Sequence, residues 1–200
     1  MERSPAQQII IVFSRKNIFT SIAGLAIAVT VLLFIPLIAM QFTGEVAWTL
    51  FDFMIAGILL FGTGLTYMLI ARKSESVSFK IAAGFALCTG LLLIWVNMAV
   101  GIIGPENNPF NLLYYGVIAA GIICAFIDRF QPKGMSISLF VMAIAMVLVT
   151  IIALFTGMHR VSGSSVIEVL GVNGFFVVLF TISALLFRYA VILPKIKTID

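Results

Sequence analysis

Long stretches of apolar residues, separated by short polar gaps, dominate this chain. Each stretch has the length of about 17 to 25 residues that a helix needs to cross the hydrocarbon core of a bilayer. The pattern therefore predicts an all-α membrane protein with six transmembrane helices in three antiparallel hairpins. The expected spans are 18–41, 49–71, 81–103, 110–127, 135–157 and 166–190.

The gaps between the spans are too short to hold a soluble domain, so residues 18–190 are predicted to form one helical bundle. In the segment 1–17, Ser4 and Pro5 have the character of an N-cap and a first helical position. This segment is expected either to lie in the membrane interface or to continue into the first span. Residues 191–200 are expected to form a short tail outside the membrane.

Basic residues are distributed unevenly over the gaps. Consecutive gaps lie on opposite sides of the membrane, and the two chain ends lie on the same side. Eleven of the twelve Lys and Arg residues fall on that side, and only Arg160 falls on the other. Cytoplasmic loops of membrane proteins carry an excess of Lys and Arg. The distribution therefore predicts that both termini are cytoplasmic, and it favours contact between the basic loops and anionic lipid headgroups.

Composition excludes several classes of function. The chain is 62% hydrophobic and 10% charged, whereas a soluble domain is about half apolar and a quarter charged. The net charge of +4 does not indicate nucleic-acid binding, because the basic residues mark helix ends. Cys88 and Cys124 lie inside spans without a CxxC pair, and His159 is the single histidine. No metal, cofactor or catalytic motif is therefore predicted.

Polar side chains within the spans are concentrated in one half of the membrane. At 1.5 Å per residue, Asp52, Asn97, Glu168 and Asn173 lie within about two turns of the outer span ends. For the inner half, the pattern predicts hydroxyl groups without ionisable residues: Thr63, Thr66, Tyr67, Thr89, Thr181 and Ser183. An ion path needs polar groups through the full thickness. The asymmetry therefore counts against a channel within one protomer and favours a pocket or partner surface on the outer face.

Local capping is an alternative explanation for several of these residues. Thr49 with Asp52 and Ser165 with Glu168 have the spacing of a capping box, in which each side chain bonds to the backbone of the other residue. Asn108 before Pro109 is typical of an N-cap and a first helical position. A cap and a binding site can use the same side chain, so both interpretations stay open.

The tract 95–115 contains more polar and aromatic residues than a short connection requires. It is interpreted either as a structural loop with interhelical hydrogen bonds or as part of a binding surface, because an Asn in the body of a span must find polar partners. The candidate ligand-binding residues of the whole chain are Asp52, Trp95, Asn97, Glu106, Asn107, Asn111, Tyr115, Glu168 and Asn173.

Four segments, 48–57, 95–115, 129–135 and 173–176, resemble an uncharacterised family of small bacterial integral membrane proteins. The resemblance covers roughly residues 43–188, and the pattern Glu-x-Asn-Pro-x-Asn from Glu106 to Asn111 is its most specific part. It implies a location in the bacterial inner membrane. It implies no catalytic residue, because no activity is assigned to the family.

Three hypotheses of function follow. The first is a non-enzymatic membrane component that binds a partner, a lipid or a small ligand at its outer, periplasmic face. The second is a small transporter or channel whose path forms between protomers and is lined by Thr63, Thr66 or Thr181. The third is a membrane enzyme in which the carboxylates of Asp52, Glu106 and Glu168 converge. The expected partners are membrane lipids and a second membrane protein or a second copy of the chain, and no nucleic acid.

Overall fold

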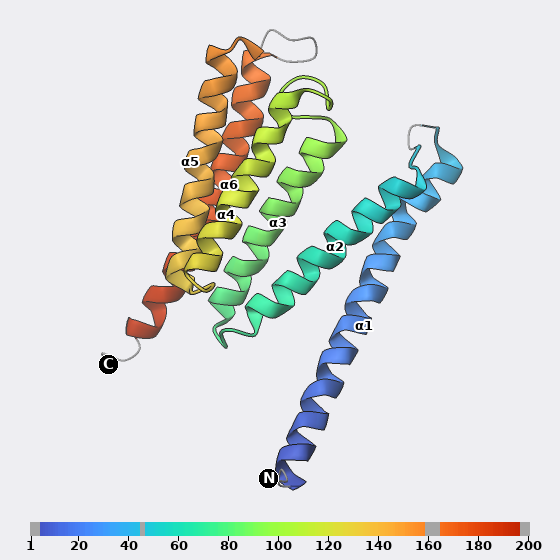
Figure 1. Cartoon of the computed structure of the whole chain (residues 1–200), viewed down its shortest axis with the longest axis vertical. Coiled ribbons are helices and arrows are strands. Elements are labelled where there is room, and N and C mark those ends of the chain that lie inside the picture. Colours follow the sequence, from blue (N-terminus) through green and yellow to red (C-terminus); the bar gives the residue numbers. More distant parts are fainter. Residues whose placement is uncertain (1–4, 45–46, 159–164, 197–200) are drawn as a thin grey trace. The chain divides into compact units, whose positions relative to one another are not determined.

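The computed structural model describes residues 5–44, 47–158 and 165–196, and Arg160 therefore lies outside the described residues. This part of the chain is helical and contains no strand. Its elements are α1 (Pro5–Phe42), α2 (Leu50–Ala71), α3 (Val77–Ala99), the short 3-10 helix η1 (Pro109–Asn111), α4 (Leu112–Ile127), α5 (Pro132–Phe155) and α6 (Val166–Ile196) (Figure 1).

Six of the described helices are long and apolar enough to cross a membrane, which confirms the predicted class of multi-pass, all-α membrane protein. Within each of the pairs α1–α2, α3–α4 and α5–α6, consecutive helices run in opposite directions (Figure 1). The predicted hairpin arrangement therefore agrees with the direction of each helix.

Several helix ends differ from the predicted spans. The helix α1 runs without interruption from Pro5, so the segment 1–17 continues into the first span. The helix α3 begins at Val77 and not at 81, because the Ser76 side chain caps it by accepting a hydrogen bond from the Phe79 N–H at 3.4 Å. The helix α6 extends into the predicted tail, as far as Ile196.

Residues up to Met68 and from Leu69 onward form two compact units. In the N-terminal unit, α1 and the larger part of α2 approach closely at Gly64. A Cβ atom on Gly64 would lie 2.3 Å from the Leu25 Cδ1 atom. A small residue at such a crossing lets two helices pack in lipid, where association depends on close van der Waals contact.

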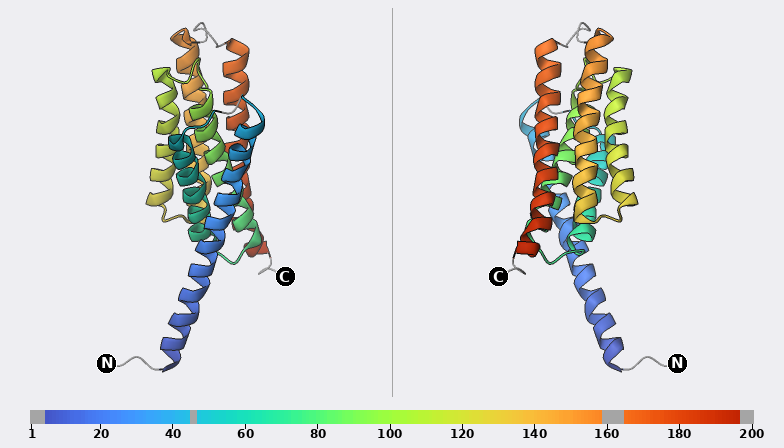
Figure 2. Two further views of the ribbon diagram at one scale, coloured as in Figure 1. Left: turned by 90° about the vertical axis from the view of Figure 1, so that its right-hand side faces the viewer. Right: turned by 90° about the vertical axis from the view of Figure 1, so that its left-hand side faces the viewer.

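The C-terminal unit contains α3, α4, α5 and α6, which run side by side (Figures 1 and 2). The helix α5 packs extensively against α6, α6 against α3 and α4 against α5, whereas α3 and α4 contact each other much less. Large aromatic side chains fill the core, and the Phe79 and Phe187 rings meet edge to face with centroids 5.4 Å apart.

Two interhelical hydrogen bonds in this unit involve serines that the sequence analysis missed. The Ser136 hydroxyl donates to the Ala184 carbonyl at 2.8 Å, and the Ser138 hydroxyl donates to the Gly121 carbonyl. Both serines are buried. The hydroxyl inventory of the predicted inner half was therefore incomplete, and these two groups join α5 to α6 and to α4.

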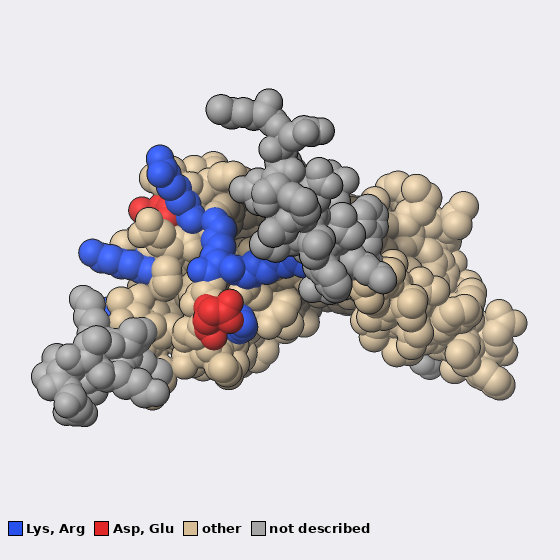
Figure 3. Space-filling view, turned by 90° about the horizontal axis from the view of Figure 1, so that it is seen from below, with Lys and Arg blue, Asp and Glu red and all other residues tan. Residues whose placement is uncertain are grey.

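One end of the C-terminal unit carries its basic side chains. The Lys73 ammonium donates a hydrogen bond to the Arg129 carbonyl at 3.0 Å and lies 4.6 Å from the centre of the Phe130 ring, so the α2–α3 and α4–α5 loops meet here. Figure 3 shows Lys and Arg at this end. We call it the basic end; its residues are Arg72, Lys73, Lys80, Arg129, Lys133 and Arg188. The opposite end, with the loop 100–108, is the distal end.

Candidate functional site

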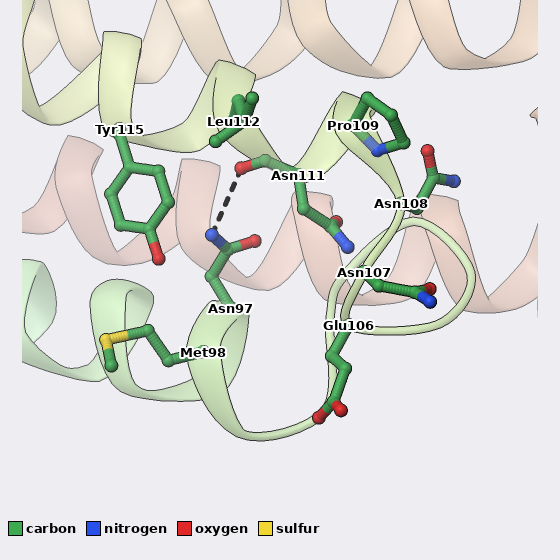
Figure 4. A pocket seen from close by; sticks show the side chains of 9 residues that line it. All are labelled: Asn97, Met98, Glu106, Asn107, Asn108, Pro109, Asn111, Leu112 and Tyr115. Carbon is green, nitrogen blue, oxygen red and sulfur yellow. Dashed lines mark hydrogen bonds between the residues drawn. The ribbon is translucent and has the colours of Figure 1, made fainter. Parts of the chain in front are cut away.

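A pocket of about 460 Å³ lies at the distal end, between the last turn of α3, the loop 100–108 and the first turn of α4 (Figure 4). Its volume is within the range of about 300 to 1,000 Å³ that is usual for ligand sites. We call it the α3–α4 pocket; its lining residues are Asn97, Met98, Glu106, Asn107, Asn108, Pro109, Asn111, Leu112 and Tyr115. The pocket brings together the predicted candidates Asn97, Glu106, Asn107, Asn111 and Tyr115.

Asn111 holds the loop in place. Its Oδ1 atom accepts hydrogen bonds from the backbone N–H groups of Ile102 and Ile103, at 3.1 and 3.0 Å. Its Nδ2 atom donates to the Pro105 carbonyl at 3.0 Å. The side chain is 4% exposed, and both of its polar atoms have partners in the protein. Asn111 therefore shapes the pocket, and its amide is not available to a ligand.

Asn108 has a second structural role in the same loop. Its Oδ1 atom accepts a hydrogen bond from the Phe110 N–H at 3.1 Å, and this confirms the predicted N-cap before Pro109. Its Nδ2 atom donates to the Ile103 carbonyl at 2.9 Å. Together, Asn108 and Asn111 bond to backbone groups of the buried part of the loop, at Ile102 and Ile103, and to the Pro105 carbonyl.

Asn97 differs from these two residues, because half of its amide is unpaired. Its Nδ2 atom donates to the Asn111 carbonyl at 3.1 Å (Figure 4). Its Oδ1 atom is buried and has no hydrogen-bond donor among the described residues, in a side chain that is 3% exposed. A buried acceptor without a donor costs about 1 to 3 kcal/mol. Such a group marks a place for a donor from outside the protein, a water molecule or a ligand.

The other polar residues of the pocket lie near its surface. Glu106 and Asn107 are exposed, and Figure 4 shows the Glu106 carboxylate at the edge of the pocket. Tyr115 is 40% exposed, and its hydroxyl is directed toward α3. Apolar walls come from Met98, Pro109 and Leu112, none of which was among the predicted ligand-binding residues. The sequence alone does not show whether an apolar residue near a helix end contacts a ligand or the lipid.

Asp52 is a helix cap. Its carboxylate accepts hydrogen bonds from the Thr49 N–H at 2.6 Å and the Thr49 hydroxyl at 2.7 Å. The Asp52 N–H donates to the Thr49 hydroxyl oxygen at 3.4 Å, which completes the predicted capping box. Asp52 belongs to the N-terminal unit, and this carboxylate has a local structural explanation.

Glu168, Asn173 and Trp95 do not line the α3–α4 pocket. The Glu168 N–H donates to the Ser165 hydroxyl at 3.1 Å, which is one half of the predicted capping box. Asn173 is buried, and its Oδ1 atom accepts a hydrogen bond from the Tyr114 hydroxyl at 3.0 Å. This bond joins α4 to α6, so Asn173 is an interhelical contact within the bundle.

Two of the three hydroxyls predicted to line a path between protomers bond within their own helices. Thr66 donates to the Gly62 carbonyl at 2.7 Å, and Thr181 donates to the Val177 carbonyl at 2.7 Å. In the part of the chain that the structure describes, no group of three or more His, Cys, Asp or Glu side chains could hold a metal ion. His159 lies outside that part.

Comparison of the chain with protein-family models, with curated proteins and with solved structures found no match. The resemblance to a small bacterial membrane-protein family therefore stays a prediction. It rests on the sequence segments that carry it.

Proposed function

We propose that this protein is a non-enzymatic, multi-pass membrane protein that binds a ligand in the α3–α4 pocket. The observation that carries the proposal is the buried, unpaired Oδ1 atom of Asn97 in the lining of this pocket. The loop 100–108 supports it, because Asn108 and Asn111 hold that loop in one conformation through five side-chain hydrogen bonds. A loop that is already held in one conformation lowers the ordering cost of binding.

The composition of the pocket favours binding over catalysis. Among the described residues that line the pocket, Glu106 is the one carboxylate, and none is a His, Lys or Cys that could act beside it as a proton donor, acceptor or nucleophile. The enzyme hypothesis requires the carboxylates of Asp52, Glu106 and Glu168 to converge, but Glu168 does not line the pocket. The Asp52 carboxylate is engaged by Thr49. The chemistry that remains is recognition of a polar group next to an apolar wall.

The sidedness of the protein belongs to the same proposal. The basic end of the C-terminal unit lies opposite the pocket, and Lys and Arg accumulate on cytoplasmic loops. We therefore place the basic end and both termini in the cytoplasm, and the pocket at the periplasmic face of a bacterial inner membrane.

Cysteine labelling tests this orientation. In a chain with Cys88→Ala and Cys124→Ala, the variant Asn107→Cys is expected to react with a membrane-impermeant maleimide on intact cells. Lys133→Cys is expected to react only after the cells are permeabilised. Asn107 is an exposed residue of the loop before η1, and Lys133 is an exposed residue in the first turn of α5, at the basic end. The reverse labelling pattern would place the pocket in the cytoplasm and overturn the orientation.

Filling the pocket tests the binding function. Leu112 is 66% exposed and lines the pocket, whereas its neighbour Leu113 is 37% exposed and does not. Leu112→Trp is expected to reduce ligand retention about tenfold, the effect of losing about 1.4 kcal/mol of binding free energy. The matched control Leu113→Trp is expected to retain as much as the wild type.

The measurement is native mass spectrometry of protein released from nanodiscs that contain equal parts of phosphatidylethanolamine, phosphatidylcholine and phosphatidylglycerol, with ethanolamine in the buffer. The activation energy is set to remove loosely attached lipid. Equal retention of lipid and amine by the wild type and by both tryptophan variants would contradict a binding role for this pocket.

A further inference from the structure

We propose that the α3–α4 pocket recognises a primary ammonium group, as carried by the ethanolamine headgroup of a phospholipid or by a small soluble amine. This inference rests on the proposed binding function and names the chemistry of its ligand. It follows from the hydrogen-bond donors and acceptors that the pocket leaves unused.

The amides of Asn97, Asn108 and Asn111 each use an N–H group within the protein. The Nδ2 atoms of Asn97, Asn108 and Asn111 all donate to backbone carbonyls. The backbone N–H groups of Ile102 and Ile103 donate to the Asn111 side chain. The side-chain donors that remain for an anionic group such as a phosphate or a carboxylate are neutral groups, such as the exposed Asn107 amide and the Tyr115 hydroxyl.

The groups that remain available are mainly acceptors. Two of them only accept, the unpaired Oδ1 atom of Asn97 and the exposed carboxylate of Glu106. The Tyr115 hydroxyl and the exposed Asn107 amide both donate and accept. None of the lining residues that the structure describes is a Lys, Arg or His. A primary ammonium offers three N–H donors and one positive charge, and hydrogen bonds between charged and polar groups are about twice as strong as neutral ones.

The ammonium must carry N–H groups to satisfy Asn97. A quaternary ammonium such as choline has none, and its methyl groups make it bulkier. Asn97 is 3% exposed, so a ligand reaches its oxygen only when a neighbouring side chain turns aside. The geometry therefore favours a small –NH3+ group over a trimethylammonium group.

The depth of the pocket matches a lipid headgroup. The membrane-spanning part of α3 ends at Ala99, and the next span begins at Pro109. The pocket lies at that boundary, with Glu106 and Asn107 on its polar side and Met98 and Leu112 on its apolar side. A phosphatidylethanolamine molecule has the same arrangement, because its ammonium lies in the polar headgroup region and its acyl chains lie in the hydrocarbon core.

The experiment compares three phospholipids with identical acyl chains in separate nanodiscs: phosphatidylethanolamine, phosphatidylcholine and phosphatidylglycerol. Native mass spectrometry of the full chain measures how many copies are retained. Phosphatidylethanolamine is expected to be retained about tenfold more than the other two, because one hydrogen bond to a charged group contributes about 1.5 to 3 kcal/mol. A fourth arm adds ethanolamine to protein in phosphatidylcholine nanodiscs, and retention of ethanolamine there would identify a soluble amine as the source of the ammonium.

The matched variants are Glu106→Gln and Glu168→Gln. Each removes one exposed carboxylate, Glu106 from the lining of the pocket and Glu168 from a position that does not line it. Glu106→Gln is expected to reduce ethanolamine-headgroup retention about fivefold or more, and Glu168→Gln to leave it unchanged. If the wild type retained all three lipids equally and Leu112→Trp lost them, the ammonium inference would be overturned and the binding function would stand. If Leu112→Trp retained as much of every lipid and of ethanolamine as the wild type, both would be overturned.

Discussion

Asn111→Leu is expected to unfold the connection between α3 and α4 and to lower the thermal midpoint of the protein by a large amount. Leucine keeps the approximate volume of the side chain and removes its polar atoms. The N–H groups of Ile102 and Ile103 then lose their acceptor. Each buried polar group without a partner costs about 1 to 3 kcal/mol, so the total loss is expected to be about 3 kcal/mol or more.

Circular dichroism at 222 nm during heating in detergent measures this loss. The matched control is Asn107→Leu, because Asn107 is an exposed residue of the same loop and its replacement is expected to change stability by less than about 0.5 kcal/mol. Asn111→Asp should give an intermediate result, because the acid keeps the Oδ1 acceptor and loses the donor to Pro105. A wild-type midpoint for Asn111→Leu would show that these hydrogen bonds do not hold the loop.

The six spans could be predicted because their signal is local and repeated over many residues. The end of α3 was predicted four residues too late, at 103, although the helix ends at Ala99. Residues 100–103 are apolar apart from Gly101, and hydropathy alone extends the span through them. In the structure, Ile102 and Ile103 are buried in the loop. Hydropathy reports burial and does not report whether the buried backbone is helical.

The caps could also be predicted, since Thr49 and Asp52 are three residues apart and lie in one helical turn whatever the rest of the bundle does. The role of each asparagine could not be predicted from the sequence. Asn173 pairs with Tyr114, 59 residues away on another helix. Asn97 and Asn111 have the same side chain, and the tertiary arrangement satisfies one and leaves the other with an unpaired oxygen. The sequence located the polar tract, and the fold determines which of its groups are free.

Gly101→Ala is expected to damage both the fold and the pocket. Gly101 has a φ of +73°, a left-handed conformation that costs a residue with a side chain about 1 to 2 kcal/mol. A Cβ atom there would lie 2.7 Å from the Asn111 Nδ2 atom, 2.8 Å from the Gly104 carbonyl oxygen and 3.0 Å from the Glu106 Cα atom. Two of these atoms belong to the backbone, so no side-chain rotation relieves the contact.

The control is Gly116→Ala, at a helical glycine where a Cβ atom would meet nothing within 4 Å. Alanine is the better helix former by about 1 kcal/mol, so Gly116→Ala is expected to keep or raise the thermal midpoint. Gly101→Ala should lower it by several degrees and weaken phosphatidylethanolamine retention in the same preparation. An unchanged midpoint for Gly101→Ala would mean that the loop accommodates a methyl group by another conformation.

The combination of these variants separates a loss of structure from a loss of ligand contact. Asn111→Leu and Gly101→Ala act on the loop that shapes the pocket, so retention and thermal midpoint should fall together. Leu112→Trp and Glu106→Gln change exposed side chains, so retention should fall while the midpoint stays near the wild-type value. If retention followed the midpoint in all four variants, the polar tract would be a structural loop, and the unpaired oxygen of Asn97 would be satisfied by water and not by a ligand.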